Sequence, residues 1–175
     1  MNQLFTGMLL IWLDLDITLG TCRIGLLPDF VGYIMLMRGL DSLREESRHF
    51  GRVRPWAMVM AVYTGVLYAM DLFGVSVDMP VLDWCLGLVA AIVALAVQYG
   101  IVGGVQDMEA AHGWDLQSDK LRTLWLALAA MQMMSALLYW IPILSIMLVI
   151  AACIVSICFL AAFYRTKKRY QEYLQ

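Results

Sequence analysis

Three aspartates interrupt apolar stretches of the sequence, where a charged side chain is costly. Asp14 and Asp16 lie in the first apolar stretch, and Asp71 lies near the end of a later one. A carboxylate at the centre of a bilayer costs on the order of 2.5–3.5 kcal/mol on insertion scales. Either protonation, which burial favours, or a cation must offset this cost. The aspartates are therefore our first candidates for ligands of a cation.

The basic residue available to these aspartates is Arg23, and one arginine cannot neutralise three carboxylates. Asp29 follows Pro28 directly and is expected at a helix start, where the helix dipole favours a negative charge by about 0.3–1 kcal/mol. Three interpretations remain open. Asp16, Arg23 and Asp29 form a structural network that pins two helices together, or they belong to a solute or ion site, or the carboxylates are uncompensated at the membrane interface.

Helical periodicity determines which of these residues can meet. Asp14 and Asp16 are about 200° apart at 3.6 residues per turn, so they cannot share one face of a regular helix. Trp12, Asp16 and Arg23 do share a face. Asp16 and Arg23 are about 10 Å apart along the axis, so they meet only if the helix loosens near Gly20. Transporters often hold cations at such unwound helix ends.

The elements that position these residues are membrane helices by composition. Of the 175 residues, 62% are apolar and 15% are charged, and the mean hydropathy is +0.76. A soluble domain is nearer half apolar and a quarter charged. A domain of this size cannot bury such an excess, because small domains keep much of their surface exposed. The lipid bilayer is therefore the expected partner of this surface, and the net charge of −2 argues against nucleic acid as a ligand.

The sequence carries no pattern typical of a cofactor site or of a catalytic centre. Its four cysteines, at positions 22, 85, 153 and 158, show no CxxC pair and no Cys/His spacing for a metal. GxSG, HExxH and GxGD motifs do not occur. We therefore expect neither a metal nor another cofactor, and we expect that the protein is not an enzyme.

Six transmembrane helices are expected, each of about 20 residues to cross a hydrocarbon core of about 30 Å. The stretch from Thr123 to Tyr164 is uncharged and too long for one crossing, so it must turn at Pro142. The fold class is thus an all-α integral membrane protein, a single domain over residues 1–175, with three helical hairpins and both termini in the cytoplasm. If the second helix does not cross, the N-terminus lies outside. The spans are expected at residues 4–20, 27–42, 55–73, 80–105, 121–140 and 142–164.

The basic residues give this topology an orientation. Eleven of the twelve Lys and Arg residues fall in three segments, and cytoplasmic loops of membrane proteins collect such residues. With six spans, all three segments lie on the cytoplasmic side. The segments are Arg38 to Arg54, Lys120 with Arg122, and Arg165 to Arg169.

Two of the expected cytoplasmic segments have apolar residues among their charges. Residues 39–54 are expected to form a weak amphipathic helix on the lipid surface, and residues 106–120 have a similar composition. The segment 39–54 either lies among anionic headgroups or docks a protein partner in the cytoplasm or the membrane. The apolar residues concerned are Leu40, Leu43, Phe50, Val53, Trp114 and Leu116.

The run LDLDITLGTCRIGLLPDFVGYIMLMRGLDSL, followed by AVYTGVLYAMDLFGV, resembles a group of small, uncharacterised bacterial multi-pass membrane proteins. Its most recognisable piece is RIGLLPDFVGYI, and the match extends from the first expected helix through the third. The resemblance implies a location in the bacterial inner membrane, and it implies no particular activity. It draws attention to Asp14, Asp16, Arg23, Pro28, Asp29 and Gly32.

The chain is also similar, in size and in its six helices, to the substrate-binding subunits of energy-coupling-factor vitamin transporters. Those subunits bind their ligand near the outer face of the membrane. The likeness concerns the fold alone. The first helix of this chain lacks the AxxxA surface with which those subunits dock their coupling subunit.

The leading hypothesis from the sequence is a membrane protein that binds or transports a small cation or a cationic solute in the outer half of the bilayer. The rival is a non-catalytic interaction subunit whose charged first hairpin is structural and whose basic loop, residues 39–54, docks a partner. Under the leading hypothesis, Asp16 and Asp71 are ligands and Arg23 orients the ligand. The ligand-binding residues are expected to be Asp14, Asp16, Arg23, Asp29 and Asp71.

Overall fold

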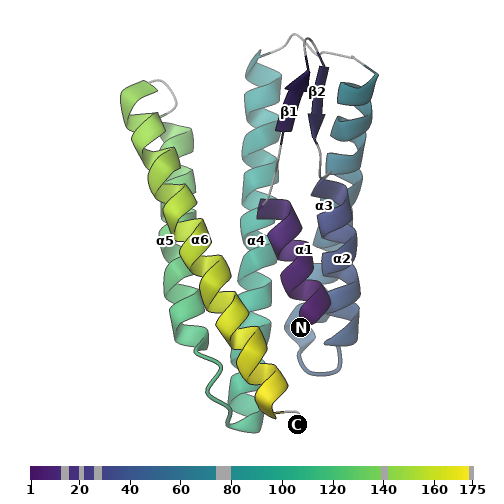
Figure 1. Cartoon of the computed structure of the whole chain (residues 1–175), viewed down its shortest axis with the longest axis vertical. Helices are drawn as coiled ribbons and strands as arrows, with labels where there is room; N and C mark the ends of the chain where they lie inside the picture. The colour runs from purple at the N-terminus through teal and green to yellow at the C-terminus, as the bar shows by residue number, and fades with distance from the viewer. Residues whose placement is uncertain (13–15, 20–21, 26–28, 74–79, 139–141, 174–175) are drawn as a thin grey trace. The chain divides into compact units, whose positions relative to one another are not determined.

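The fold is that of a computed structural model of residues 1–175. The whole chain is described except residues 13–15, 20–21, 26–28, 74–79, 139–141 and 174–175, and the backbone alone is described for residues 16–19, 22–25, 71, 80, 81, 83, 136, 142 and 145. The described residues form six α-helices and one two-stranded antiparallel sheet (Figure 1). The elements are α1 (Asn2–Trp12), β1 (Asp16–Leu19), β2 (Cys22–Gly25), α2 (Asp29–Ser42), α3 (Arg48–Leu72), α4 (Pro80–His112), α5 (Ser118–Leu137) and α6 (Pro142–Tyr173).

The first of two compact units comprises residues 1–97, and its core is built from α1, α2 and α3. α1 and α2 run antiparallel, because Leu4 near the start of α1 meets Gly39 near the end of α2, and Ile11 meets Gly32. α2 packs in turn on α3, and β2 contacts α3 (Figure 1). The buried side chains of this unit include Leu4, Met8, Leu36, Leu40, Phe50, Val53, Ala57 and Met60.

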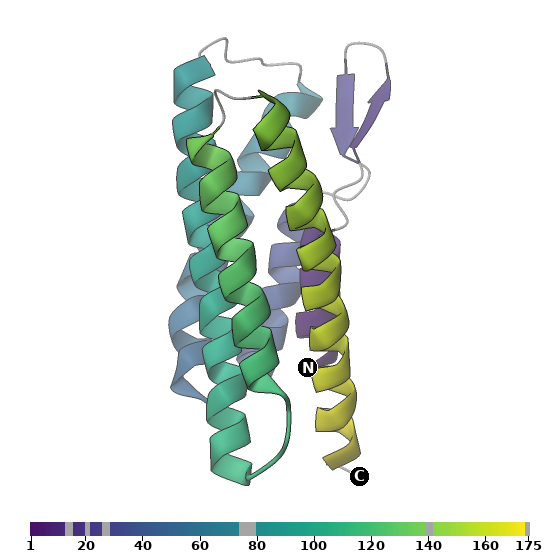
Figure 2. The ribbon, with the colours of Figure 1, turned by 90° about the vertical axis from the view of Figure 1, so that its left-hand side faces the viewer.

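The second unit comprises residues 98–175 and contains the end of α4 with α5 and α6. α5 and α6 lie side by side and run in opposite directions (Figure 2). The loop that joins α4 to α5 lies at the same end of this unit as the C-terminal end of α6. The buried side chains of this unit include Ile101, Val102, Val105, Met108, Leu116, Leu121, Leu128, Phe159 and Phe163.

Two helices in the described part of the chain are long and apolar enough to cross a membrane. They are Trp84–His112, within α4, and Ile146–Tyr173, within α6. In their most apolar stretches only 33% and 17% of the residues are buried, whereas the core helix of a soluble domain hides its apolar side chains. Both helices are therefore compatible with a membrane protein.

Several helices differ in length from the expected spans. α1 ends at Trp12 instead of residue 20, and a β-hairpin follows it. α4 continues to His112 and α6 to Tyr173, beyond the expected ends at residues 105 and 164. The expected ends were set by the last apolar residue, but a helix continues through polar turns until a breaker stops it. Gly113, with φ +66°, is such a stop after α4.

The prolines confirm one expected boundary and correct another. α5 ends at Leu137 and α6 begins at Pro142, so the predicted turn at Pro142 is confirmed. Proline suits this first helical position, where its missing N–H is no loss. α3, in contrast, begins at Arg48 and includes Pro55 in its interior, so the expected start of this helix at residue 55 was wrong.

The segment 39–54 is not a separate helix on the lipid surface. α2 extends to Ser42, and α3 begins after Ser47, whose Oγ accepts a hydrogen bond from the N–H of His49 at 3.1 Å. The apolar residues of the segment are buried, because they belong to the faces on which the helices of the first unit pack. The expectation that they contact lipid was therefore wrong for Leu40, Leu43, Phe50 and Val53.

Candidate functional site

The first candidate site lies where the expected first membrane helix is broken. α1 ends at Trp12, α2 begins at Asp29, and β1 and β2 form a hairpin in the chain between them (Figure 1). The prediction of one helix over residues 4–20 is therefore wrong. The sequence DITLGTCRIG explains the hairpin, because isoleucine and threonine favour strands. A glycine at the first position of a two-residue connection also suits a hairpin turn.

The register of the hairpin places positions 16 and 23 on one face. Asp16 pairs with Gly25, and Thr18 pairs with Arg23. Residues directly opposite each other share a face, as do alternate residues of one strand, so positions 16 and 23 are diagonal neighbours. A continuous helix would have separated them by about 10 Å along its axis. A hairpin, instead of a loosened helix, brings these two backbone positions near each other.

Glycines bring α1 and α2 into direct backbone contact. A Cβ at Gly7 would lie 2.6 Å from the backbone nitrogen of Leu36 and 2.7 Å from the carbonyl oxygen of Gly32. A Cβ at Gly39 would lie 2.6 Å from the backbone nitrogen of Leu4. Real Cβ atoms essentially never approach so closely, so any other residue would push the helices apart. Small residues allow this close packing between membrane helices, and here it holds the end of α1 beside the start of α2.

The break therefore presents two helix ends of opposite polarity. The last carbonyl groups of α1 carry a partial negative charge, and the first N–H groups of α2 carry a partial positive charge. Asp29 is the first residue of α2, and one of its carboxylate oxygens is buried. Nε1 of Trp12 is also buried, and it has no hydrogen-bond partner among the residues that the structure describes. Broken helices with such ends bind ions and charged solutes in transporters.

α3 forms a wall of the same site. The ring centroids of Phe30 and Tyr68 lie 5.8 Å apart, with a tilt of 58° between the rings. A Cβ at Gly65 would lie 3.7 Å from the Cβ of Phe30, so α2 and α3 pack closely here as well. Asp71 follows Tyr68 by three residues, and its backbone position therefore lies on a neighbouring part of the same face of α3.

Of the five predicted ligand-binding residues, the structure describes one in full. Asp29 is partly buried at the start of α2. Asp16 begins β1, Arg23 lies in β2, and Asp71 lies in the last turn of α3; for these three the backbone alone is described. Asp14 lies outside the described residues. The elements that carry Arg23, Asp29 and Asp71 belong to the same packed unit, since both α2 and β2 contact α3.

The predicted set of ligand-binding residues did not include the aromatic residues beside the break. Trp12, Phe30 and Tyr68 lie in helices next to the predicted ligands, and each is within three residues of a predicted aspartate in the sequence. That proximity is the signal that could have identified them. In the part of the chain that the structure describes, no group of three or more His, Cys, Asp or Glu side chains could hold a metal ion.

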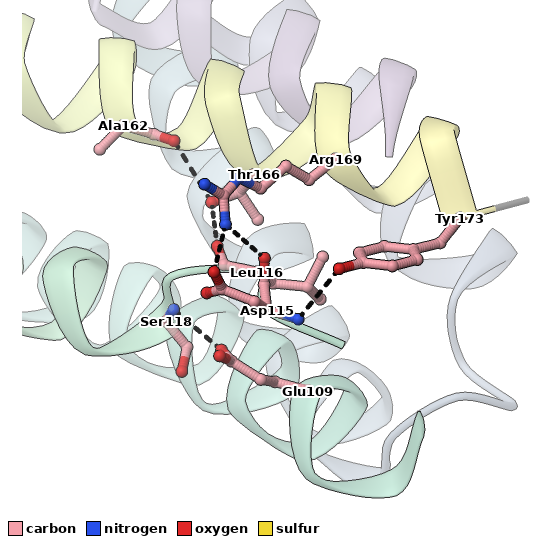
Figure 3. A network of polar contacts seen from close by, with 8 residues as sticks. All are labelled: Glu109, Asp115, Leu116, Ser118, Ala162, Thr166, Arg169 and Tyr173. Atoms are coloured by element: carbon pink, nitrogen blue, oxygen red, sulfur yellow. Dashed lines mark hydrogen bonds and ion pairs between the residues drawn. The ribbon is translucent and has the colours of Figure 1, made fainter. Parts of the chain in front are cut away.

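A second polar cluster joins the loop between α4 and α5 to the end of α6 (Figure 3). Nη1 of Arg169 donates to a carboxylate oxygen of Asp115 at 2.6 Å and to its carbonyl oxygen at 2.8 Å. The buried Thr166 donates through Oγ1 to the carbonyl oxygen of Leu116 at 2.9 Å. The N–H of Asp115 donates to the hydroxyl of Tyr173 at 3.5 Å. These contacts fasten the loop to α6.

Aromatic rings hold the same loop. Trp114 stacks on His112 with ring centroids 4.3 Å apart and on Tyr173 with centroids 5.2 Å apart. Tyr170 meets the Trp114 ring edge-on at 5.8 Å. The segment 106–120 is therefore a helix end, a short clamped loop and the start of α5. The expectation that this segment resembles one on the lipid surface was wrong for Leu116, because this residue is fully buried.

A carboxylate from α4 caps the start of α5. Gln117 precedes the helix in a left-handed conformation, and its side chain makes no capping hydrogen bond. Oε2 of Glu109 instead accepts a hydrogen bond from the N–H of Ser118 at 2.9 Å. A negative charge is favourable at this helix end. The contacts of the second cluster thus serve the packing of the second unit, and they bring no reactive group to an open site.

No protein-family model, no curated protein and no solved structure matches this chain. The geometry of the two clusters is therefore the basis for a function. Within the described residues, the break between α1 and α2 is the cluster that combines two helix ends of opposite polarity with the buried N–H of Trp12, which has no partner there.

Proposed function

We propose that the protein is a multi-pass protein of the bacterial inner membrane that binds or transports a small cation or a cationic solute at the break between α1 and α2. The observation that carries the proposal is the β-hairpin between two short helices, in a segment that also contains Asp14, Asp16, Arg23 and Asp29. Three features support this function: the membrane placement, the depth of the break and the sign of its charge.

Exposed apolar side chains support the membrane placement. On α3, the valines at positions 59, 62 and 66 are 55%, 60% and 53% exposed. α6 exposes Ile146, Ile150 and Ile154 in the same way, at 61%, 57% and 58%. Soluble proteins rarely expose contiguous apolar surfaces of this kind, whereas lipid covers them without cost. The family resemblance of the sequence and its three basic segments support the inner membrane and a cytoplasmic position for both termini.

Helix lengths support a position of the break inside the bilayer. α1 has 11 residues and α2 has 14, so they extend over about 16 Å and 21 Å, less than the hydrocarbon core of about 30 Å. α3 has 25 residues and extends over about 37 Å, enough to cross. α1 begins beside the end of α2, close to the start of α3. The break lies beside the second half of α3, and in the proposed topology this position is in the outer half of the membrane.

Non-helical backbone at this depth needs partners for its polar groups. An unsatisfied N–H or C=O in hydrocarbon costs several kcal/mol, and irregular backbone is tolerated only where protein buries it or where it lines a water-filled cavity. β2 contacts α3, which covers part of the hairpin. A hydrated, ligand-binding cavity would satisfy the remaining backbone groups and the carboxylates together, and this is the arrangement that we propose.

The charge balance of the site determines its ligand. Asp14, Asp16, Asp29 and Asp71 bring four carboxylates, and Arg23 brings one guanidinium. When these groups are ionised, the site is negative and attracts a cation from the outer side. The rings of Phe30 and Tyr68 beside the break would suit an organic ammonium group as well as a metal ion, because a ring face attracts a cation.

The test is a ligand-dependent melting temperature of the purified protein in mild detergent. The panel contains Na⁺, K⁺, Ca²⁺ and organic amines, measured with the wild type, with Asp16→Asn and Asp71→Asn, and with Asp119→Asn as a control from the start of α5. A ligand at 100 times its dissociation constant adds about 2.7 kcal/mol, which raises the melting temperature by about 5–10 °C. We expect this rise in the wild type and the control. Full retention of the rise in both site variants, or no rise with any ligand, would refute the proposal.

The rival function, an interaction subunit that docks a protein through residues 39–54, has less support. Protein interfaces gain affinity from buried apolar and aromatic anchors. In this segment those side chains face the core of the first unit, as the burial of Leu40, Leu43, Phe50 and Val53 indicates. What the segment offers to a partner is a set of arginines.

A further inference from the structure

One face of α3 changes from basic to apolar along its length while staying exposed. The face consists of Arg48, Arg52, Pro55, Val59, Val62 and Val66, all exposed. These residues follow each other at spacings of four, three, four, three and four residues, which keeps them on one side of the helix. The first two are arginines and the last three are valines.

Arg44, in the turn before α3, adds a third guanidinium to the basic end of this face. Its Cγ and Nε atoms each lie 3.8 Å from the position of a Cβ at Gly51. Gly51 lies one turn after Arg48 and directly before Arg52. The side chain of Arg44 therefore lies beside α3 at Gly51, close to the positions of the two other arginines. We call Arg44, Arg48 and Arg52 the arginine cluster.

The arginine cluster lacks acidic partners within the described part of the chain. None of its three side chains forms an ion pair or a hydrogen bond with the residues that the structure describes, although Glu45 is exposed in the same turn. Arg54 differs, because its Nε lies 2.5 Å from Oδ1 of Asp41. The cluster also lies at the N-terminal end of α3, where the helix dipole disfavours cations. Three like charges in this position call for an anion.

We infer that the arginine cluster binds the phosphate group of an anionic phospholipid in the cytoplasmic leaflet. The inference rests on the membrane placement proposed above and is independent of the cation site. A guanidinium presents a planar fork of N–H donors that matches the oxygens of a phosphate. The cluster would hold the headgroup, and Val59, Val62 and Val66 would contact the acyl chains of lipids on the same face.

Two further observations favour a lipid over a protein as the bound partner. Trp56, one turn after Arg52, is 54% exposed, and tryptophan is enriched at the level of the headgroups. The exposed surface next to the cluster is continuous with the apolar face of α3, which lipid acyl chains would cover in the proposed membrane placement. The apolar side chains of segment 39–54 that could anchor a protein there are buried in the first unit.

The test compares lipid binding by the purified full chain in detergent with charge-removing variants. The probes are short-chain phosphatidylglycerol, phosphatidylcholine and inorganic phosphate. The variant replaces all three cluster residues (Arg44→Gln, Arg48→Gln and Arg52→Gln), and Arg54→Gln is the matched control on another face of α3. An arginine near an anionic headgroup contributes about five-fold in binding, so the triple variant should bind phosphatidylglycerol about 100-fold more weakly. The control should keep the affinity of the wild type.

Several results would overturn the inference. These are an unchanged affinity of the triple variant, an equal loss in Arg54→Gln, equal binding of phosphatidylcholine, or a cluster that binds inorganic phosphate as tightly as the lipid. A protein that co-purifies through the cluster and that phosphatidylglycerol does not displace would also overturn it. If the triple variant does not fold, Arg48→Lys and Arg52→Lys test the same point, because lysine keeps the charge but loses the fork.

The outcome can be separated from that of the cation site. Release of the wild type from membranes by alkaline carbonate would remove the membrane placement and, with it, both proposals. Loss of the lipid effect alone would leave the response of Asp16→Asn and Asp71→Asn unaffected. Loss of the cation response alone would leave the arginine cluster and its lipid binding intact.

Discussion

The backbone contact between α1 and α2 makes a sharp prediction for Gly39→Ala. The added Cβ would lie 2.6 Å from the backbone nitrogen and 2.8 Å from the Cα of Leu4. These atoms belong to the backbone of α1 and cannot rotate away as the end of a flexible side chain could. The two helices must therefore separate, and the packing along their whole interface must change.

The size of the effect follows from two opposing terms. In an uncrowded helix, alanine is more favourable than glycine by about 0.5–1 kcal/mol. Overpacking a tight core costs typically about 1–3 kcal/mol, and contact with backbone atoms places Gly39 near the upper end of this range. The net loss of stability should be about 2 kcal/mol, which lowers the melting temperature by about 4–8 °C in a chain of this length.

Gly87→Ala is the matched control. Gly87 lies in α4, and a Cβ at this position would meet no heavy atom within 4 Å. The same substitution should here raise stability slightly, by up to about 1 kcal/mol, because only the helix-propensity term acts. Both variants and the wild type are unfolded by heat in the same detergent and followed by circular dichroism. If Gly39→Ala melts at the temperature of Gly87→Ala, the close approach of α1 and α2 is not present.

Two other predictions test the clamp and the hairpin. Thr166→Val removes a buried hydrogen-bond donor to the α4–α5 loop and should lower the free energy of unfolding by about 1–3 kcal/mol. The control is Thr123→Val, an exposed residue that is hydrogen-bonded within its own helix, and it should change the stability by less than about 0.5 kcal/mol. Equal effects of the two substitutions would contradict the attachment of the loop to α6. In a chain without native cysteines, Thr18→Cys with Arg23→Cys should form an intramolecular disulfide on mild oxidation, because these positions are paired in the hairpin. A continuous helix would hold them about 7–8 Å apart along its axis, beyond the usual reach of a disulfide, so failure to cross-link would refute the register.

The helical class and the turn at Pro142 were predictable because each depends on local properties. A chain that is 62% apolar can form helices without a large soluble core, and a long uncharged stretch with one proline has one obvious place to turn. The hairpin was not predictable from the same properties. Hydropathy does not distinguish a short apolar strand from one turn of an apolar helix, and residues 16–19 fit both patterns. The β-branched residues and Gly20 were the available signal, and the expected length of a membrane helix outweighed it.

The candidate site was predictable only in its charged part. An aspartate within an apolar stretch can be recognised from the sequence, because a charge in apolar surroundings is energetically costly. Asp16 and Asp71 could therefore be named. The contact of Phe30 with Tyr68 depends on how α2 packs on α3, and no local pattern encodes that. The burial of Phe50 illustrates the same limit. An amphipathic pattern defines an apolar face, but it does not say whether lipid or another helix covers that face.

The glycine contacts also explain why α1 ends at Trp12. Backbones in contact at Gly7 and Gly39, with the side chain of Ile11 packed on Gly32, leave no room for a charged side chain along the interface of α1 with α2. A helix continued past Trp12 would have carried Asp14, seven residues after Gly7, onto the same close-packed face. The end of the helix at Trp12 avoids that arrangement. The packing that stabilises the two short helices therefore also accounts for the change from helix to hairpin between them.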